Sequence, residues 1–174
     1  MRKIFTAAAL ALAALALVAV SAAAQTGQAG QKASFAGTWV LDQGRSYNLP
    51  RTVKQTMTVV QDGDKLTVET EIESEQGKRT VKDVYTLDGK EADFTPQIQN
   101  DPNAKGKRTG RWVPGGKSFV VEETIATKNP EGAPVQITIT RKWLLWADGS
   151  LSIDIHQDTP RGSSESRRFF TKKT

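Results

Sequence analysis

Apolar and polar residues alternate along several stretches of the chain. In "KLTVETEIE", Leu66, Val68, Thr70 and Ile72 fall on one face, and the residues between them are Thr or Glu. Strict alternation is the pattern of a half-buried β-strand. "LSIDIHQ" and the first half of "VQITITRKWLLW" alternate in the same way. Further strands are predicted in "TVKQTMTVVQ", "RTVKDVYTL", "KEADF", "RTGRWV", "KSFVVEETIATK" and "SESRRFFTKK".

Turn residues separate these strands at short intervals. The clearest signals are Asp-Gly pairs and Pro-Gly clusters, at 62–64, 88–89, 114–116, 147–149 and 159–162. Only the polar stretch 95–107 is long enough for a crossover connection, which a sandwich would need. A meander of many strands tends to close, because closure removes exposed edges. The sequence therefore predicts an all-β fold, an antiparallel up-and-down β-barrel of about 8–10 strands.

The first 24 residues have the features of a secretory signal peptide. Arg2 and Lys3 precede an apolar run over 4–20, and Ala22 and Ala24 form an Ala-x-Ala cleavage pattern. A retained membrane anchor is the alternative, but no basic flank follows the run. We therefore expect removal of 1–24 and a secreted or periplasmic protein of bacterial type without a stable membrane anchor. After the signal peptide we expect a flexible tether over 25–34 and a single domain over 35–174.

The charge balance does not indicate a nucleic-acid partner. Without the predicted signal peptide the chain keeps 22 basic and 19 acidic residues, a net charge of +3. The charges are mixed, and no basic run is interleaved with aromatic residues. The chain has no Cys, so its stability must come from the core and the sheet without disulfides.

The order of several motifs resembles a known family. "GTWVLDQGRS" contains the Gly-x-Trp motif that opens the first strand of lipocalins and related calycin barrels. "DGDKLTV", "YTLDGKE" and "PRG" follow in the order seen in bacterial secreted lipocalin-like proteins. The resemblance implies that Trp39 plugs the closed end of a barrel. It also implies that an Arg of the last strand, Arg167 or Arg168, lies across the indole.

Three charges fall on predicted inward faces. Asp83, Glu123 and Arg141 alternate in phase with apolar neighbours, and a buried charge must be paired or neutralised. We hypothesise a polar cluster inside the barrel that holds the polar end of a ligand, with Tyr85 and Trp143 nearby. The alternative is that these residues reach solvent at strand ends or only brace the core.

The sequence gives little support for catalysis or a cofactor. His156 is the only His, lies on the outward phase of its strand and has no evident nucleophile partner. One His and no Cys do not make up the ligand set of a typical zinc site, and Asp62–Lys65 offers too few ligands for calcium. There is no phosphate-binding Gly-rich loop. We expect no enzyme activity, no metal and no cofactor.

Three classes of function remain, of which an enzyme is the least favoured, and the barrel interior distinguishes the other two. A binding protein would hold a small hydrophobic or amphipathic molecule in an open cavity. An interaction protein, for example a hydrolase inhibitor, could have a filled barrel and act through the loops 95–107 and 129–134. The first is the predicted function. The sequence does not indicate an oligomeric state.

Overall fold

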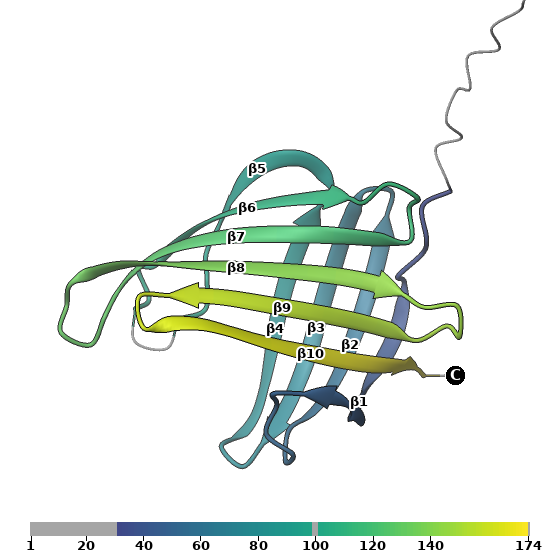
Figure 1. The fold of residues 1–174 in the computed structure, drawn as a ribbon, viewed down its shortest axis with the longest axis horizontal. Coiled ribbons are helices and arrows are strands. Elements are labelled where there is room, and N and C mark those ends of the chain that lie inside the picture. The colour runs from purple at the N-terminus through teal and green to yellow at the C-terminus, as the bar shows by residue number, and fades with distance from the viewer. Residues whose placement is uncertain (1–30, 99–100, 174) are drawn as a thin grey trace, which may run out of the picture.

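Ten strands make up the computed structural model, which describes residues 31–98 and 101–173. The predicted signal peptide and residues 25–30 of the predicted tether lie outside the described residues. In the described ranges, no helix is long and apolar enough to cross a bilayer. The strands are β1 (Gly37–Tyr47), β2 (Lys54–Asp62), β3 (Lys65–Ser74), β4 (Gly77–Thr86), β5 (Asp88–Phe94), β6 (Lys105–Trp112), β7 (Ser118–Lys128), β8 (Pro134–Leu145), β9 (Leu151–Thr159) and β10 (Gly162–Lys172) (Figure 1).

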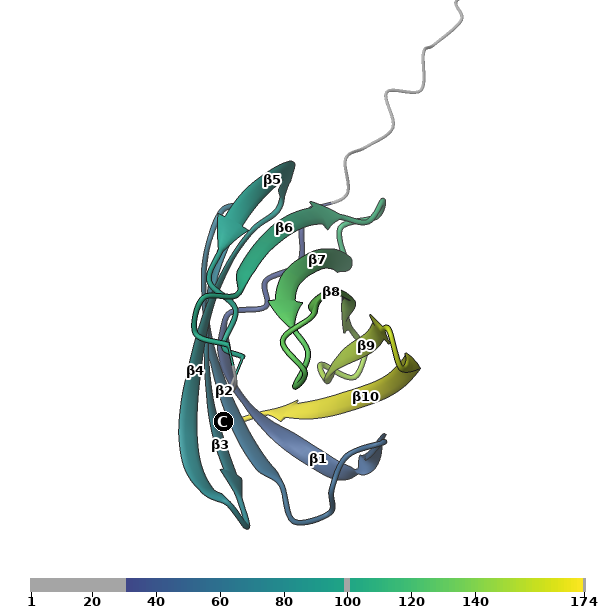
Figure 2. The same ribbon diagram turned by 90° about the vertical axis from the view of Figure 1, so that its left-hand side faces the viewer.

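The strands form one antiparallel sheet in which sequence neighbours pair. The order is β4-β3-β2-β1-β10-β9-β8-β7-β6-β5, so β1 pairs with β10 and the sheet curls around a common interior (Figure 2). The two outermost strands, β4 and β5, are not paired with each other, and we call this gap the seam. The predicted up-and-down barrel is confirmed, with ten strands and a nearly closed wall. The predicted loop 95–107 is too long by three residues, because β6 begins at Lys105.

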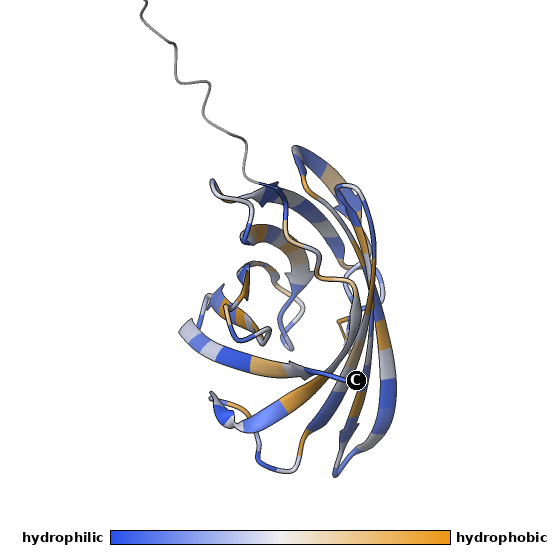
Figure 3. Ribbon diagram, turned by 90° about the vertical axis from the view of Figure 1, so that its right-hand side faces the viewer, coloured by the Kyte–Doolittle hydropathy of each residue, from blue (hydrophilic) through white to orange (hydrophobic). Residues whose placement is uncertain are grey.

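Burial follows the alternation that the sequence predicts. Leu66, Phe119, Val121 and Leu151 are fully buried, and apolar and polar bands alternate along the ribbons (Figure 3). Outward residues are mostly polar or charged, and the few exceptions include Val60. Burial of the inward apolar side chains is the main stabilising contribution in a chain without disulfides.

Aromatic side chains fill one end of the barrel, where the chain enters at β1 and leaves at β10. Phe35 contacts Phe119, Trp112 and Trp143 with ring centroids 4.9 to 6.3 Å apart. Trp39 is 1% exposed, and its indole N–H donates a hydrogen bond to the Phe35 carbonyl at 2.9 Å. We call this the closed end; the opposite end, bordered by the loops 48–53, 75–76, 129–133 and 160–161 and by the described residues 95–98 and 101–104 between β5 and β6, is the open end.

The cation above Trp39 differs from the one that the resemblance implied. The Lys172 ammonium lies 5.4 Å from the Trp39 ring centroid, because the register places these residues opposite each other. Arg168 lies four residues earlier, about 13 Å along an extended strand. Arg167 points outward and pairs with Asp154 at 3.0 Å. The expectation that Arg167 or Arg168 covers Trp39 was wrong.

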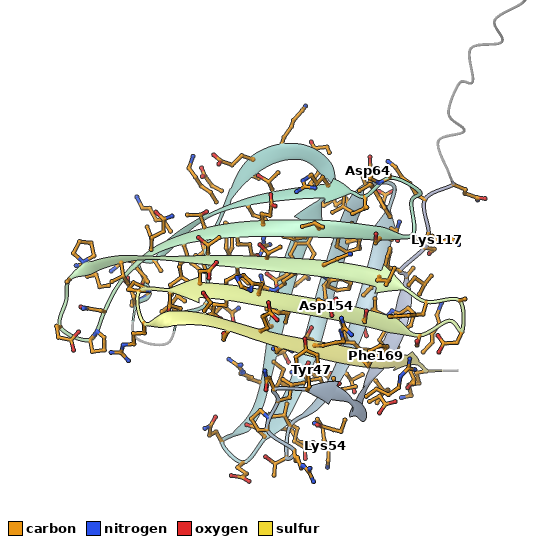
Figure 4. The ribbon with its side chains drawn as sticks, viewed as in Figure 1. Tyr47, Lys54, Asp64, Lys117, Asp154 and Phe169 are labelled. Carbon is orange, nitrogen blue, oxygen red and sulfur yellow. The ribbon has the colours of Figure 1, made fainter. Side chains whose placement is uncertain are left out.

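The N-terminal segment reaches the barrel at the closed end. The Ala33 amide donates to the Gly116 carbonyl at 2.7 Å, and the Lys32 ammonium pairs with Asp64 at 2.6 Å. Asp64 and Lys117 both lie at this end of the molecule (Figure 4). The chain therefore enters the barrel on the side opposite the open end.

Gly110 allows β6 to approach the end of β4 beside the seam. A Cβ atom at this position would lie 2.5 Å from the Thr86 carbonyl oxygen and 2.9 Å from a Leu87 methyl group. The first neighbour is backbone, so it cannot rotate away. A side chain at residue 110 would therefore push the two strands apart.

We expect Gly110→Ala to lower the free energy of unfolding by about 2 kcal/mol, as overpacking does. Urea unfolding measures the change. Gly44→Ala is the control, because its Cβ would meet only one side-chain oxygen at 3.4 Å. Equal stability of the two variants would contradict the close approach at Gly110.

Candidate ligand-binding site

A cavity of about 320 Å³ lies inside the barrel next to the aromatic cluster of the closed end. Trp143 belongs to both, so the cluster forms one boundary of the cavity. Its walls combine apolar and charged side chains. The apolar lining consists mainly of Met57, Val68, Ile72, Val81, Ile125, Ile139, Ile153, Ile155 and Phe170.

The sequence-predicted ligand residues all line this cavity. Glu123 is 2% exposed at its side chain, whereas Asp83 and Arg141 are 32% and 25% exposed. Arg141 forms an ion pair with Glu123. Tyr85 and Trp143 are buried beside them, with ring centroids 6.0 Å apart. The structure brings the five side chains together, while their role in binding remains a prediction.

Arg108 of β6 connects the two carboxylates. Its Nε donates to Glu123 at 2.6 Å, and its two terminal nitrogens donate to Asp83 at 2.8 Å and to the Val84 carbonyl at 3.0 Å. The guanidinium carbon also lies 4.6 Å from the Tyr85 ring centroid. Asp83, Arg108, Glu123 and Arg141 thus form a continuous chain of ion pairs from β4 to β8, which we call the polar row.

Arg108 was not predicted as a site residue, because the residues beside it do not show the apolar alternation of a strand. Gly106 and Gly110 occupy the inward positions on either side of it, so no apolar alternation marks this stretch. The Phe94 ring occupies the space that a side chain at residue 106 would take, and a Cβ there would lie 2.3 Å from the ring. Gly-x-Arg-x-Gly with a period of two was the available signal.

Arg168 also lines the cavity, and it forms no ion pair with any described residue. Burial, with a further contribution from Arg141, lowers the pKa of Arg168. An arginine nevertheless keeps its charge at neutral pH. With Arg79, Arg108 and Arg141, four guanidinium groups therefore line a cavity that contains two carboxylates.

Unpartnered polar atoms converge on the same cavity. Among the described residues, three buried side-chain atoms lack a hydrogen-bond partner: Gln55 Oε1, Trp143 Nε1 and Arg168 Nε. All three residues line the cavity. Buried polar groups are almost always hydrogen-bonded, so such atoms require an explanation. A polar group entering the cavity could supply partners after small side-chain rotations.

Tyr85 can act as a hydrogen-bond donor. Burial raises the pKa of its hydroxyl, Asp83 and Glu123 add to the shift, and Arg141 and Arg108 oppose it. The phenol therefore stays protonated over the whole physiological range. A protonated hydroxyl beside guanidinium groups provides a further donor for an anion.

The other titratable groups considered from the sequence lie outside the barrel. His156 is 44% exposed at its side chain, and its ring nitrogens lie 3.2 Å from Asp158 and 3.3 Å from Glu165. Asp154, the partner of Arg167, lies on the outer face of β9 (Figure 4). No group of three His, Asp or Glu side chains in the described ranges is placed to hold a metal ion. The charged cluster with restricted solvent access is the polar row.

A scan against protein-family models and a search of curated proteins found no match to the chain. Two solved structures show a distant similarity of shape. One is the zebrafish ileal bile acid-binding protein complexed with cholic acid, at 15% identity and a TM-score of 0.44, covering 81% of this chain and 100% of that protein. The other is secretory abundant heat soluble protein 4 from Ramazzottius varieornatus, at 12% identity and a TM-score of 0.45, covering 80% and 94%.

Proposed function

We propose that this protein is an exported barrel that binds a small, partly apolar anion in its interior. The observation that carries the proposal is the composition of the cavity. It combines an apolar wall with four guanidinium groups and two carboxylates, and its unpartnered polar atoms include two N–H donors. Ligand pockets typically have this character, with few polar groups among many apolar ones.

A carboxylate-like group would complete the electrostatics of the cavity. An unpaired buried cation is unfavourable, and a bound anion removes that penalty. Arg168 and the Tyr85 hydroxyl can donate to the anion, while Met57, Val68 and Ile153 contact its apolar part. A volume of about 320 Å³ is near the lower limit for drug-sized ligands, so the ligand is small.

The signal-peptide pattern supports export, and the fold supports an accessible barrel. The N-terminal segment attaches at the closed end through Ala33 and Lys32, away from the open end. The cavity favours a binding protein over an inhibitor that acts through loops, because an inhibitor does not need an unfilled interior. Membership of the bacterial secreted lipocalin-like family remains a proposal based on the motif order.

Arg168 and Arg167 provide a matched pair for testing the binding site. We expect Arg168→Met to weaken the binding of decanoate at least about tenfold, equivalent to roughly 1.4 kcal/mol. Arg167→Met should leave the Kd unchanged, because this side chain pairs with Asp154 outside the barrel. Titration calorimetry with decanoate measures both, and decanol is the neutral comparison ligand.

Two results would contradict this proposal. One is equal binding of decanoate and decanol by the unmodified protein, which would remove the preference for an anion. The other is equal weakening by both Arg substitutions, which would separate binding from the cavity. Native mass spectrometry of protein purified from an exporting host is an independent test for a copurified small molecule.

A further inference from the structure

Gln55 of β2 is a buried polar side chain that an anionic ligand alone leaves without a partner. The residue is 5% exposed and lines the cavity, and its Oε1 atom accepts no hydrogen bond from any described residue. We infer that the ligand is a hydroxylated carboxylate, whose hydroxyl group binds the Gln55 carboxamide while its carboxylate binds Arg168. This inference rests on the proposed binding function, since it names the chemical class of the same ligand.

The chemistry of the Gln55 side chain requires a donor from the ligand. An ionised carboxylate is only an acceptor, and so is the amide oxygen of Gln55. A hydroxyl group can donate to Oε1, and it can also accept from the amide nitrogen of the same side chain. A buried acceptor without a donor is unfavourable, so a ligand that supplies the donor gains affinity at this position.

The unpartnered donors of the cavity lie together on another part of the wall. Arg168 of β10 and Trp143 of β8 are both opposite Ile153 of β9, so the three residues form one inward row across three strands. Arg168 Nε and Trp143 Nε1 are the unpartnered N–H groups among the described residues. A carboxylate has two acceptor oxygens, so an anion in front of Ile153 can accept from both donors. This row is therefore the anionic part of the site.

Gln55 is separated from this row by apolar wall. It lies opposite Ile72 of β3, and both Ile72 and Phe170 of β10 line the cavity. Only β1 lies between β2 and β10. Two strand spacings therefore separate Gln55 from Arg168, which places their Cα atoms roughly 10 Å apart or more. The separation leaves room for apolar carbon atoms between the carboxylate and the hydroxyl group of the ligand.

The charges near Gln55 favour a neutral donor over a cationic one. Arg79 of β4 lies opposite Ile72, the partner of Gln55, and also lines the cavity. Burial lowers the pKa of Arg168, and the charges of Arg141 and Arg79 contribute in the same direction, so these guanidinium groups are close enough to interact. An ammonium group would add a further cation to them, whereas a hydroxyl group adds none.

Ligands that differ by one hydroxyl group test the inference on the unmodified protein. Titration calorimetry compares decanoate with 3-hydroxydecanoate, 6-hydroxydecanoate and 10-hydroxydecanoate, which place the hydroxyl group at three distances from the carboxylate. We expect at least one of the three to bind about fivefold more tightly than decanoate, as one additional hydrogen bond to a buried group allows. This comparison does not depend on the folding of any variant.

Gln55→Leu and Gln97→Leu are the matched variants. Both residues line the cavity, but Gln97 is exposed, so solvent can reach its amide. Replacing an unpartnered buried amide with an apolar side chain of similar size should not destabilise the fold, and urea unfolding checks this. Gln55→Leu should bind the hydroxydecanoates no more tightly than decanoate, without a loss of affinity for decanoate itself. Gln97→Leu should keep the preference for the hydroxylated ligand.

The possible results separate this inference from the proposed function. If decanoate binds and none of the hydroxydecanoates binds more tightly, solvent satisfies Gln55 and the inference is overturned, while the anion-binding function stands. The same holds if Gln55→Leu keeps the preference for a hydroxydecanoate. If the unmodified protein binds neither decanoate nor any hydroxydecanoate, the inference and the proposed function are both overturned.

Discussion

Replacing Glu123 with Gln is expected to lower the free energy of unfolding by about 3 kcal/mol, since breaking a buried ion pair strongly destabilises a protein. Glu123 is 2% exposed and pairs with both Arg108 and Arg141. Without its charge, two guanidinium groups would share the interior with Asp83 as the remaining carboxylate of the polar row. Gln has nearly the same shape as Glu, so the expected loss of stability comes from the missing charge.

The same substitution should strengthen anion binding. It removes a negative charge from the cavity lining, so decanoate should bind more tightly and restore part of the lost stability by mass action. Urea unfolding with and without decanoate measures both effects. A decrease in stability without tighter binding would show that the polar row only braces the core.

Glu122 is the matched control for this experiment. It is the adjacent residue, points outward and pairs with Arg111 at 3.0 Å, with both side chains about half exposed. Exposed ion pairs contribute about 0–1 kcal/mol. Glu122→Gln should therefore change neither stability nor decanoate affinity appreciably, and a loss equal to that of Glu123→Gln would contradict the distinction between the two faces.

Much of this fold could be predicted from local sequence signals. Asp-Gly and Pro-Gly turns mark most hairpins, and alternation identifies the inward phases that contain Leu66, Val121 and Ile153. The seam could not be predicted in this way. A missing strand pair leaves no turn signal and no change of period, because both strands are paired on their other side.

The candidate site was only partly predictable for a related reason. Asp83, Glu123 and Arg141 are polar residues within apolar alternation, so their phase identifies them. Arg108 lies between glycines, which hides its phase. Adjacent Arg167 and Arg168 are followed by two Phe residues, so either phase of β10 has one of each type. The register of β1 against β10 shows which phase of β10 faces inward. Trp39 lies opposite Lys172, and the same phase contains Arg168 and Phe170, which line the cavity.

The two ends of the barrel have separable roles, which Trp39 can test. Its indole is 1% exposed, hydrogen-bonded to the Phe35 carbonyl and absent from the described cavity lining. We expect Trp39→Ala to lower the free energy of unfolding by about 3–5 kcal/mol, as truncation of a buried aromatic residue does. Thermal and urea unfolding measure the loss.

Ligand affinity gives the second measurement. Below the unfolding transition, Trp39→Ala should bind decanoate with a Kd within about twofold of the original protein, because the cavity lining is unchanged. Trp146→Ala is the control for tryptophan removal, since Trp146 is 42% exposed and packs on the outer face against Phe169. An unchanged melting temperature for Trp39→Ala would exclude its role as the plug of the closed end. If the fully folded Trp39→Ala variant binds decanoate much more weakly, the binding site extends into the closed end. The aromatic cluster would then contact the ligand or position the residues that do.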